Sequence, residues 1–280
     1  MAPGATYILQ KPDIQDLAVR GHLRLRLRPQ VVRLVEEIAD RARGFFRQSV
    51  AAKRRARLEG VHEGWQPFGG EFSISPDRPD LHESFWVTRG RAAAAAAYAC
   101  PLGRELHGRM LDYLEIVQDL ESQITQELLD WLGVDRSRPP YPRSLESDLQ
   151  VLFYQPARES RELLQDPHED SLSLTFTWAD QPGLELLGRD GAYQPVALAP
   201  NELAVLPGEI LSLMTGRRVV PQMHRVMRHS NQSERVTLSY FSAPDDAPDT
   251  ILEPWVTGSG IDAASLRERV RSNRLKYLVP

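Results

Sequence analysis

The first half of the chain predicts helices separated by irregular segments. Apolar and charged residues alternate over residues 21–29, "GHLRLRLRP", which predicts a strand with a buried face and a solvated arginine face. Residues 29–60 place apolar side chains at helical spacing, and the basic run 53–57 suits the C-terminal end of that helix. Residues 60–90 carry Gly and Pro at close intervals and predict an irregular segment with aromatic anchors. One continuous apolar stripe predicts a long helix over residues 101–132.

From residue 147 the pattern changes to short β-rich segments separated by Gly, Pro, Asn or Asp. The eight segments are "SDLQVLFYQ", "SLSLTFTWA", "GLELLG", "AYQPVALA", "NELAVLPG", "EILSLMTG", "PQMHRVMRH" and "ERVTLSYFSA". Strands at this spacing predict a sandwich or barrel, with the double-sheeted jelly roll as the leading candidate. A loop follows Phe241, and residues 262–278 predict a final helix.

Together these elements predict a fold that is mainly β with α. A jelly-roll (double-stranded β-helix) core is expected over residues 146–243. An N-terminal helical and irregular region, 1–145, packs on it, and a C-terminal tail with a helix covers 244–280. A chain of 280 residues can bury a sizeable core, and we expect the three parts to form one structural unit.

Composition narrows the class of protein. The net charge of −4 disfavours nucleic acid as a partner, because such proteins usually carry a basic surplus. The single cysteine, Cys100, allows no internal disulfide and suits a reducing compartment. The longest apolar run, residues 92–100, is far shorter than the roughly 20 residues that cross a bilayer. The first residues lack a signal-peptide pattern, so a cytoplasmic protein without a membrane partner is expected. The composition leaves the oligomeric state open.

The stretch "HEDSLSLTF" carries the first candidate chemistry. If residues 168–178 form one strand, His168 and Asp170 share a face with Leu174 and Phe176, since residues i and i+2 point the same way. A carboxylate on an apolar face costs several kcal/mol unless it is paired or bound to a metal. A single His-x-Asp pair is weak support by itself, and taken singly it is better explained by a buried core histidine beside a turn-capping aspartate.

Two later segments add to this pair. His224 in "PQMHRVMRH" faces away from His229, so only one of these two histidines can join His168 and Asp170, and His224 is the choice. Two histidines and one carboxylate form the facial triad of non-haem Fe(II) oxygenases, and we call His168, Asp170 and His224 the triad. In "ERVTLSYF", Arg235 and Thr237 also share a face, on the strand expected beside that of His224. An inward arginine needs an anion, and the hydroxyl beside it completes a carboxylate clamp.

These ordered pieces resemble the isopenicillin N synthase-like branch of the 2-oxoglutarate and Fe(II)-dependent oxygenases. "HED" is similar to the family's His-x-Asp, "QMHRV" to the segment around its distal histidine, and "RVT" to its Arg-x-Ser. "PGLELLGRDGAYQPV" and "NELAVLPGEIL" resemble its spacers, and "FYQP" resembles its Tyr-containing strand. The resemblance is strong over residues 147–242 and looser before them.

The resemblance implies a function for each matching position. The triad would hold Fe(II), while Arg235 and Thr237, with Tyr154, would bind the distal carboxylate of the co-substrate 2-oxoglutarate. The expected reaction uses O2, converts 2-oxoglutarate to succinate and CO2, and hydroxylates, desaturates or cyclises a small molecule, by analogy in secondary metabolism. Thr237 stands where the family usually has serine, which keeps the hydroxyl.

Several alternatives stay open at this point. A 2-oxoglutarate-independent Fe(II) oxidase of the same fold shares the triad and the clamp, and a non-catalytic jelly-roll binding protein needs neither. Four aromatic residues, Trp65, Phe68, Phe153 and Phe241, are candidates for a substrate pocket, although aromatic side chains more often belong to the core. His107 is expected to be a partly exposed residue of the long helix, and the remaining histidines are expected to be surface or structural residues.

Overall fold

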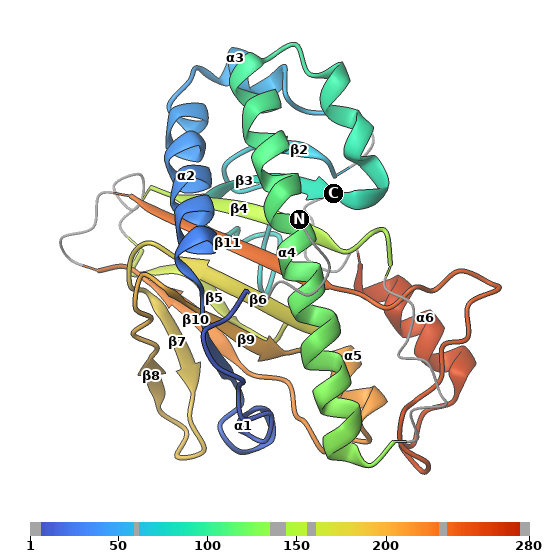
Figure 1. The fold of residues 1–280 in the computed structure, drawn as a ribbon. Coiled ribbons are helices and arrows are strands. Elements are labelled where there is room, and N and C mark those ends of the chain that lie inside the picture. The colour runs from blue at the N-terminus through green and yellow to red at the C-terminus, as the bar shows by residue number, and fades with distance from the viewer. Residues whose placement is uncertain (1–6, 59–61, 135–143, 156–160, 230–233, 275–280) are drawn as a thin grey trace.

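The centre of the molecule is a pair of antiparallel β-sheets that face each other, with helices packed on the outer face of the larger sheet (Figure 1). This computed structural model describes residues 7–58, 62–134, 144–155, 161–229 and 234–274. The two stacked antiparallel sheets confirm the predicted jelly-roll core with flanking helices.

The larger sheet has seven strands in the order β1-β9-β6-β11-β4-β3-β2, and the smaller has four in the order β5-β10-β7-β8. The strands of the larger sheet are β1 (Leu23–Arg26), β2 (Gly64–Gln66), β3 (His82–Thr88), β4 (Asp148–Tyr154), β6 (Leu174–Ala179), β9 (Glu202–Pro207) and β11 (Arg235–Ser242). Those of the smaller sheet are β5 (Leu163–His168), β7 (Leu184–Leu187), β8 (Tyr193–Pro195) and β10 (His224–Met227). Three strands of the larger sheet therefore come from the region before residue 146.

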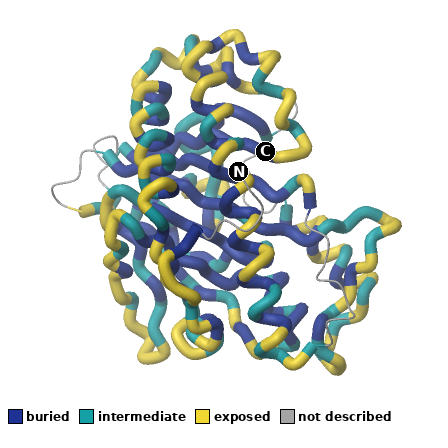
Figure 2. Tube along the Cα trace, in the orientation of Figure 1, coloured by how far each residue is buried: buried dark blue, intermediate teal, exposed yellow. Residues whose placement is uncertain are grey.

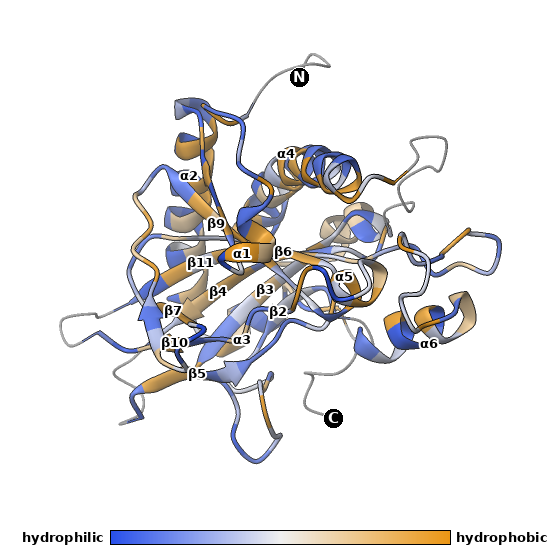
Figure 3. Ribbon diagram, turned by 90° about the horizontal axis from the view of Figure 1, so that it is seen from below, coloured by the Kyte–Doolittle hydropathy of each residue, from blue (hydrophilic) through white to orange (hydrophobic). Residues whose placement is uncertain are grey.

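Two long helices cover the outer face of the larger sheet, and the shorter ones lie at its ends (Figure 1). The helices are α1 (Asp16–Val19), α2 (Pro29–Phe46), α3 (Val50–Arg54), the 3-10 segment η1 (Arg89–Ala97), α4 (Pro101–Leu132), α5 (Glu209–Met214) and α6 (Ala263–Asn273). Helices α2 and α4 bury one side against each other and the sheet and expose the opposite side (Figure 2). Figure 3 shows the matching separation of hydrophobic and hydrophilic residues on α4. Within the described ranges, no helix has the length and apolar character needed to cross a membrane.

The alternation along β4 shows how the larger sheet divides the interior. Leu149, Val151 and Phe153 point outward into the main hydrophobic core, where the ring of Phe153 stacks on that of Phe46 at 5.0 Å. The intervening residues of β4 point inward, toward the smaller sheet, and line a cavity. Because successive side chains of a strand alternate faces, one strand supplies both the core and the cavity wall.

Several elements differ from those that the sequence pattern predicts. Residues 209–214 form helix α5 rather than a strand, because six residues are too few to separate a buried helix from a strand by periodicity. Residues 163–168 form β5, which the pattern missed because Pro167 is unusual in a strand. The edge position of β5 tolerates a proline. Residues 82–88 form β3 inside the segment expected to be irregular.

The strand expected to run from His168 to Trp178 is interrupted. His168 ends β5 in the smaller sheet, and β6 begins at Leu174 in the larger sheet, so Asp170 lies in the connection between them. The face rule therefore does not extend across this segment. Leu174 and Phe176 belong to the main core, whereas Thr175 lines the cavity with Asp170.

Lys53 and the predicted surface residue His107 are both buried in the N-terminal half. His107 is fully buried on α4, where its ring nitrogen lies 3.0 Å from Glu63, because β2 and β3 cover that part of the helix. The predicted helix over residues 29–60 divides into α2 and α3, and Lys53, in the last turn of α3, forms a buried ion pair with Glu83. The solvated arginine face of β1 is confirmed by the exposed Arg24 and Arg26.

Candidate active site

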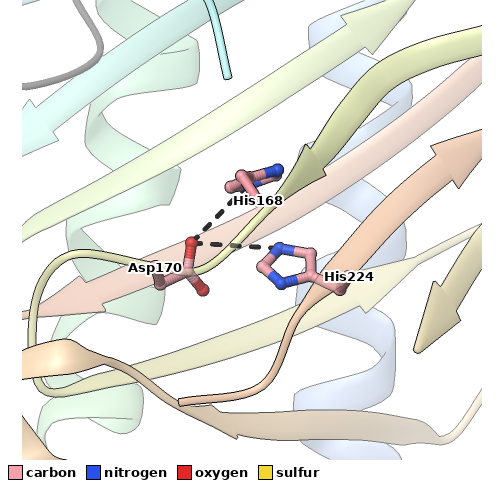
Figure 4. A group of neighbouring side chains, drawn as sticks. All are labelled: His168, Asp170 and His224. Carbon is pink, nitrogen blue, oxygen red and sulfur yellow. Dashed lines mark ion pairs between the residues drawn. The ribbon is translucent and has the colours of Figure 1, made fainter. Parts of the chain in front are cut away.

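The triad converges from two neighbouring strands and the turn that follows one of them. His168 at the end of β5 is the direct cross-strand partner of His224 at the start of β10, and their ring centroids are 4.2 Å apart. Asp170 reaches both histidines from the β5–β6 connection (Figure 4). Its Oδ1 lies 3.8 Å from Nε2 of His168 and 3.9 Å from Nε2 of His224.

Hydrogen bonds on the far side of each ring orient the two histidines. Nδ1 of His168 donates to the backbone carbonyl of Asp166 at 2.8 Å, and Nδ1 of His224 donates to that of Gln222 at 3.0 Å. A carbonyl oxygen only accepts, so these bonds leave the Nε2 lone pairs directed at Asp170. Metal-binding histidines commonly have their second nitrogen held in this way.

The charges within the triad suit a cation. Burial lowers the pKa of His168 to about 4, with His224 as the next cause, so its imidazole is neutral near pH 7. Asp170 is 5% exposed, and its Oδ2 is buried without a hydrogen-bond partner. Two imidazoles and one buried carboxylate with an unused oxygen form a donor set that fits Fe(II) and leaves further coordination positions open. The three residues could therefore hold that metal.

Arg235 lies in the same interior, on the first position of β11, and is only 2% exposed. Its Nη1 donates to the hydroxyl of Thr237, and its Nε donates to the backbone carbonyl of Gln181 at 3.2 Å. Within the described ranges it forms no ion pair, and burial lowers its pKa. A buried guanidinium without a carboxylate partner is a site for an anionic ligand, which matches the clamp expected from the sequence.

Two residues beside the clamp shape it. Tyr154 is the cross-strand partner of Arg235, whose guanidinium lies 5.1 Å from the centre of the tyrosine ring. His82 packs edge-on against that ring from β3, and burial lowers its pKa to about 3, so it adds no charge. Gly183 allows the backbone to pass close to the guanidinium of Arg235, because a Cβ at this position would lie 3.3 Å from Nε of Arg235. The sequence pattern did not single out His82 or Gly183.

The triad and the clamp share one cavity of about 120 Å³ between the two sheets, and Tyr154 also lines it. Of the four aromatic candidates, only Phe241 lines this cavity. Phe68 packs against a neighbouring cluster around Leu152 and Tyr154, while Trp65 and Phe153 lie in the main core on the far side of the sheet. Their core position differs from the expectation of a pocket role, because Phe153 falls on the outward parity of β4.

The cavity also contains residues that the sequence reasoning missed. Phe72 and Trp86 line it, as do three acidic residues, Glu71, Asp80 and Asp148. The missed strand β3 explains the omission, since Trp86 lies on it and its alternation decides which neighbours face inward. Asp148 could have been found from the alternation of β4, where it shares the inward face with Tyr154.

Fold and site together define a class: a jelly-roll protein with a facial-triad metal site beside a buried carboxylate clamp. Comparison with known sequences supports this class. Residues 146–244 match the family model described as the 2OG-Fe(II) oxygenase superfamily. The matched residues make up the jelly-roll core, which is therefore similar to this superfamily, whose members are enzymes that use Fe(II), 2-oxoglutarate and O2. The narrower isopenicillin N synthase-like placement is consistent with these matches.

Similar sequences include named dioxygenases. The 2-oxoglutarate-dependent dioxygenase frbH of Dothideomycetidae sp. is 24% identical over 79% of this chain and 71% of its own length. Gibberellin 20 oxidase 2 of Oryza sativa is 28% identical over 79% of this chain and 58% of its own length. The chain thus spans little more than half of the rice enzyme.

Similar solved structures support the fold. A full-length Neurospora crassa protein in complex with alpha-KG superposes with a TM-score of 0.74 at 16% identity, covering 92% of this chain and 88% of that one. A 2OG-Fe(II) oxygenase family protein from Caulobacter crescentus gives a TM-score of 0.71 at 21% identity, covering 94% and 93% of the two chains.

Proposed function

We propose that this protein is a Fe(II)- and 2-oxoglutarate-dependent oxygenase that oxidises a small molecule. The observation that carries the proposal is one cavity that holds both the triad and a buried Arg235, which forms no ion pair with any residue that the structure describes. When bound there, iron and 2-oxoglutarate would supply an O2-dependent oxidation of the substrate with release of succinate and CO2. Hydroxylation, desaturation and cyclisation are the outcomes expected of this chemistry.

The residues of the chain have separate tasks in this proposal. The triad holds the metal, and the carbonyl-bonded Nδ1 atoms keep both imidazole rings in the binding orientation. Arg235 and Thr237 bind the distal carboxylate of 2-oxoglutarate, and Tyr154 packs against the guanidinium that makes this contact. The surrounding sheets exclude water, which strengthens each of these polar contacts.

Anaerobic absorption spectroscopy tests this proposal. Adding Fe(II) and then 2-oxoglutarate to the metal-free protein is expected to produce a weak visible metal-to-ligand charge-transfer band that requires both components. His224→Ala should abolish the band, whereas His229→Ala, five residues further along and exposed, should retain it. Binding of iron without a band on adding 2-oxoglutarate would favour the 2-oxoglutarate-independent oxidase. Failure to bind iron would leave a jelly-roll binding protein.

The finer assignments belong to the same proposal. Fungal sequences named as 2-oxoglutarate-dependent dioxygenases and an oxidoreductase are among the relatives, and they support a place in secondary metabolism. A concave site between the two sheets suits a small-molecule substrate. A cytoplasmic location, the absence of a nucleic-acid partner and the assignment of each site residue remain predictions from the sequence.

A further inference from the structure

The cavity carries charged groups that neither the triad nor the clamp uses. Glu71, Asp80 and Asp148 all line it, and we call these three residues the acid row. The row follows the β3 side of the cavity. Asp80 lies just before β3, Glu71 accepts a hydrogen bond from Nε1 of Trp86 on β3 at 3.2 Å, and Asp148 begins β4, the neighbouring strand.

One member of the acid row, Asp148, lies at the end of the cavity opposite the clamp. Tyr154, beside Arg235, and Asp148 stand six residues apart on β4 and share its inward face. A strand rises about 3.3 Å per residue, so roughly 20 Å separates these two positions. Asp148 therefore lies at the end of the cavity opposite Arg235, and Glu71 lies between the two ends, beside Trp86. Asp80 lies nearer the clamp, because it comes two residues before His82, the cross-strand partner of Tyr154.

Asp80 has an unused ligand atom. The residue is 2% exposed; its Oδ2 accepts from the hydroxyl of Ser73 at 2.8 Å, but its Oδ1 is buried without a hydrogen-bond partner. Among the described residues, no member of the acid row forms an ion pair. The nearest cation at the far end, Arg274, already binds Asp246 at 2.7 Å. A buried carboxyl oxygen that lines a cavity without a partner points to a missing donor.

The energetics of the row agree with a missing cation. Burial raises the pKa of each of the three carboxyl groups to about 7, and the proximity of Glu71 raises those of Asp80 and Asp148 further. Negative charge on the row is therefore costly in the empty cavity. A positive group entering it would remove that cost.

Aromatic side chains stand next to these carboxyl groups. Phe72 and Trp86 line the cavity beside Glu71, and Phe241 is the cross-strand partner of Asp148. Aromatic faces attract ammonium and guanidinium groups through their ring quadrupoles. Aromatic rings together with carboxylates form a typical surrounding for an organic cation.

We propose that the acid row and the adjoining aromatic side chains bind a positively charged nitrogen, so that the substrate is a small amine or guanidine. This inference rests on the proposed function, because the row is assigned to the substrate of the same oxygenase site. The clamp takes the anionic co-substrate, so the two ligands meet groups of opposite charge. The reacting part of the substrate lies between the acid row and the triad.

A matched pair of probes tests the substrate class. Isothermal titration calorimetry would compare phenethylamine with its neutral analogue 2-phenylethanol, using the full chain with Fe(II) and saturating 2-oxoglutarate under anaerobic conditions. The amine is expected to bind at least tenfold tighter than the alcohol. Equal or weaker binding of the amine would overturn the inference, and this comparison needs no variant.

Substitutions in the acid row test which residues cause the preference for the amine. Asp80→Asn and Asp148→Asn should each reduce the preference for the amine at least threefold and leave alcohol binding unchanged. Asp77→Asn, an exposed neighbour in the same segment as Asp80, should keep the full preference. Circular dichroism spectra would confirm that each variant folds. A preference that survives in the double variant Asp80→Asn/Asp148→Asn would contradict the role of the row.

The two proposals fail in different ways. The probe titration is repeated on the metal-free protein with 2-oxoglutarate present, while the charge-transfer band is recorded separately. If the charge-transfer band appears but phenethylamine binds no tighter than 2-phenylethanol, the role of the acid row is refuted and the proposed oxygenase function stands. If phenethylamine binds tighter, the acid-row variants remove this preference, and no charge-transfer band appears, the cavity binds a cation and the proposed oxygenase function is refuted.

Discussion

Asp80 is a residue whose burial opposes folding. Its pKa is raised to about 7 in the folded chain, whereas an aspartate in an unfolded chain titrates near 3.9. Between these values the folded state binds more protons than the unfolded state, so the free energy of unfolding falls as the pH rises from about 4 to about 7. The protein thus retains a carboxyl group that costs stability, as is common at binding sites.

This cost predicts the effect of Asp80→Asn. The amide keeps an acceptor for Ser73 but cannot ionise, so the variant should exceed the parent protein in free energy of unfolding by about 2 kcal/mol at pH 8. Near pH 4 the two proteins should be nearly equal. Urea unfolding at both pH values measures this, with Asp77→Asn as the control that should change nothing. A variant that is less stable at pH 8 would mean that Asp80 has a cationic partner.

Arg235 is the second residue whose environment makes a clear prediction. Arg235→Lys keeps the charge but loses the planar fork that contacts both Thr237 and the Gln181 carbonyl. We expect the dissociation constant of 2-oxoglutarate, measured by titrating the charge-transfer band, to rise by about 10- to 100-fold. The exposed Arg24→Lys serves as the control. An unchanged constant in Arg235→Lys would remove Arg235 from the co-substrate site.

At the scale of elements, β4 separates stability from binding by the parity of its residues. Phe153 faces the helices, where it stacks on Phe46, and its neighbour Tyr154 faces the cavity. Phe153→Leu should therefore lower the free energy of unfolding by about 1–2 kcal/mol, through the lost aromatic pair and poorer packing. The affinity for 2-oxoglutarate should stay within twofold of the parent value. Weaker binding at full stability would contradict the core assignment.

The elements that the sequence predicted are those with long or regular patterns. The 32-residue helix α4 follows its apolar stripe, and β4 and β11 follow their alternation. Helix α5 and strand β5 could not be predicted in the same way, because each has only six residues and their pairing depends on chain segments far away in sequence. Local propensity decides little over so few residues.

The candidate site was found by reasoning that was partly wrong. His168 and Asp170 do converge, but through a turn between two sheets and not by sharing a strand face. A continuous β-rich stretch gives no sign of where the chain leaves one sheet for the other. Of the acid row, Asp148 could be placed on the inward face by the alternation of β4, but Glu71 and Asp80 could not be predicted, because they lie in a segment between strands whose neighbours only the three-dimensional structure reveals.

At the scale of the whole molecule, the triad connects segments that are distant in sequence. The chain between Asp170 and His224 contains β6 to β9 and α5. A metal ion bound by the triad closes this loop and binds the folded state only. At 100 times its dissociation constant such an ion adds about 2.7 kcal/mol to the free energy of unfolding.

Metal removal should therefore loosen one part of the protein more than the rest. We expect Fe(II), or Mn(II) in air, to raise the melting temperature by about 5–10 °C and EDTA to reverse the change. Hydrogen exchange should slow most in β5 and β10 and least in α4. In His224→Ala, the metal should change neither the melting temperature nor the hydrogen exchange. Equal slowing of hydrogen exchange in all elements would contradict a stabilisation centred on the triad.

The inner face of the larger sheet repeats at a fixed interval. Directly opposed pairs on β4 and β11 form four successive rows: Tyr154 with Arg235, Leu152 with Thr237, Gln150 with Ser239, and Asp148 with Phe241. Neighbouring rows are about 6.6 Å apart. If a charged nitrogen of the substrate is fixed beside one of these residue pairs and the metal lies beside another, the distance between the nitrogen and the metal along the sheet is constant. The spacing of the rows then selects which carbon atom, counted from that nitrogen, is oxidised.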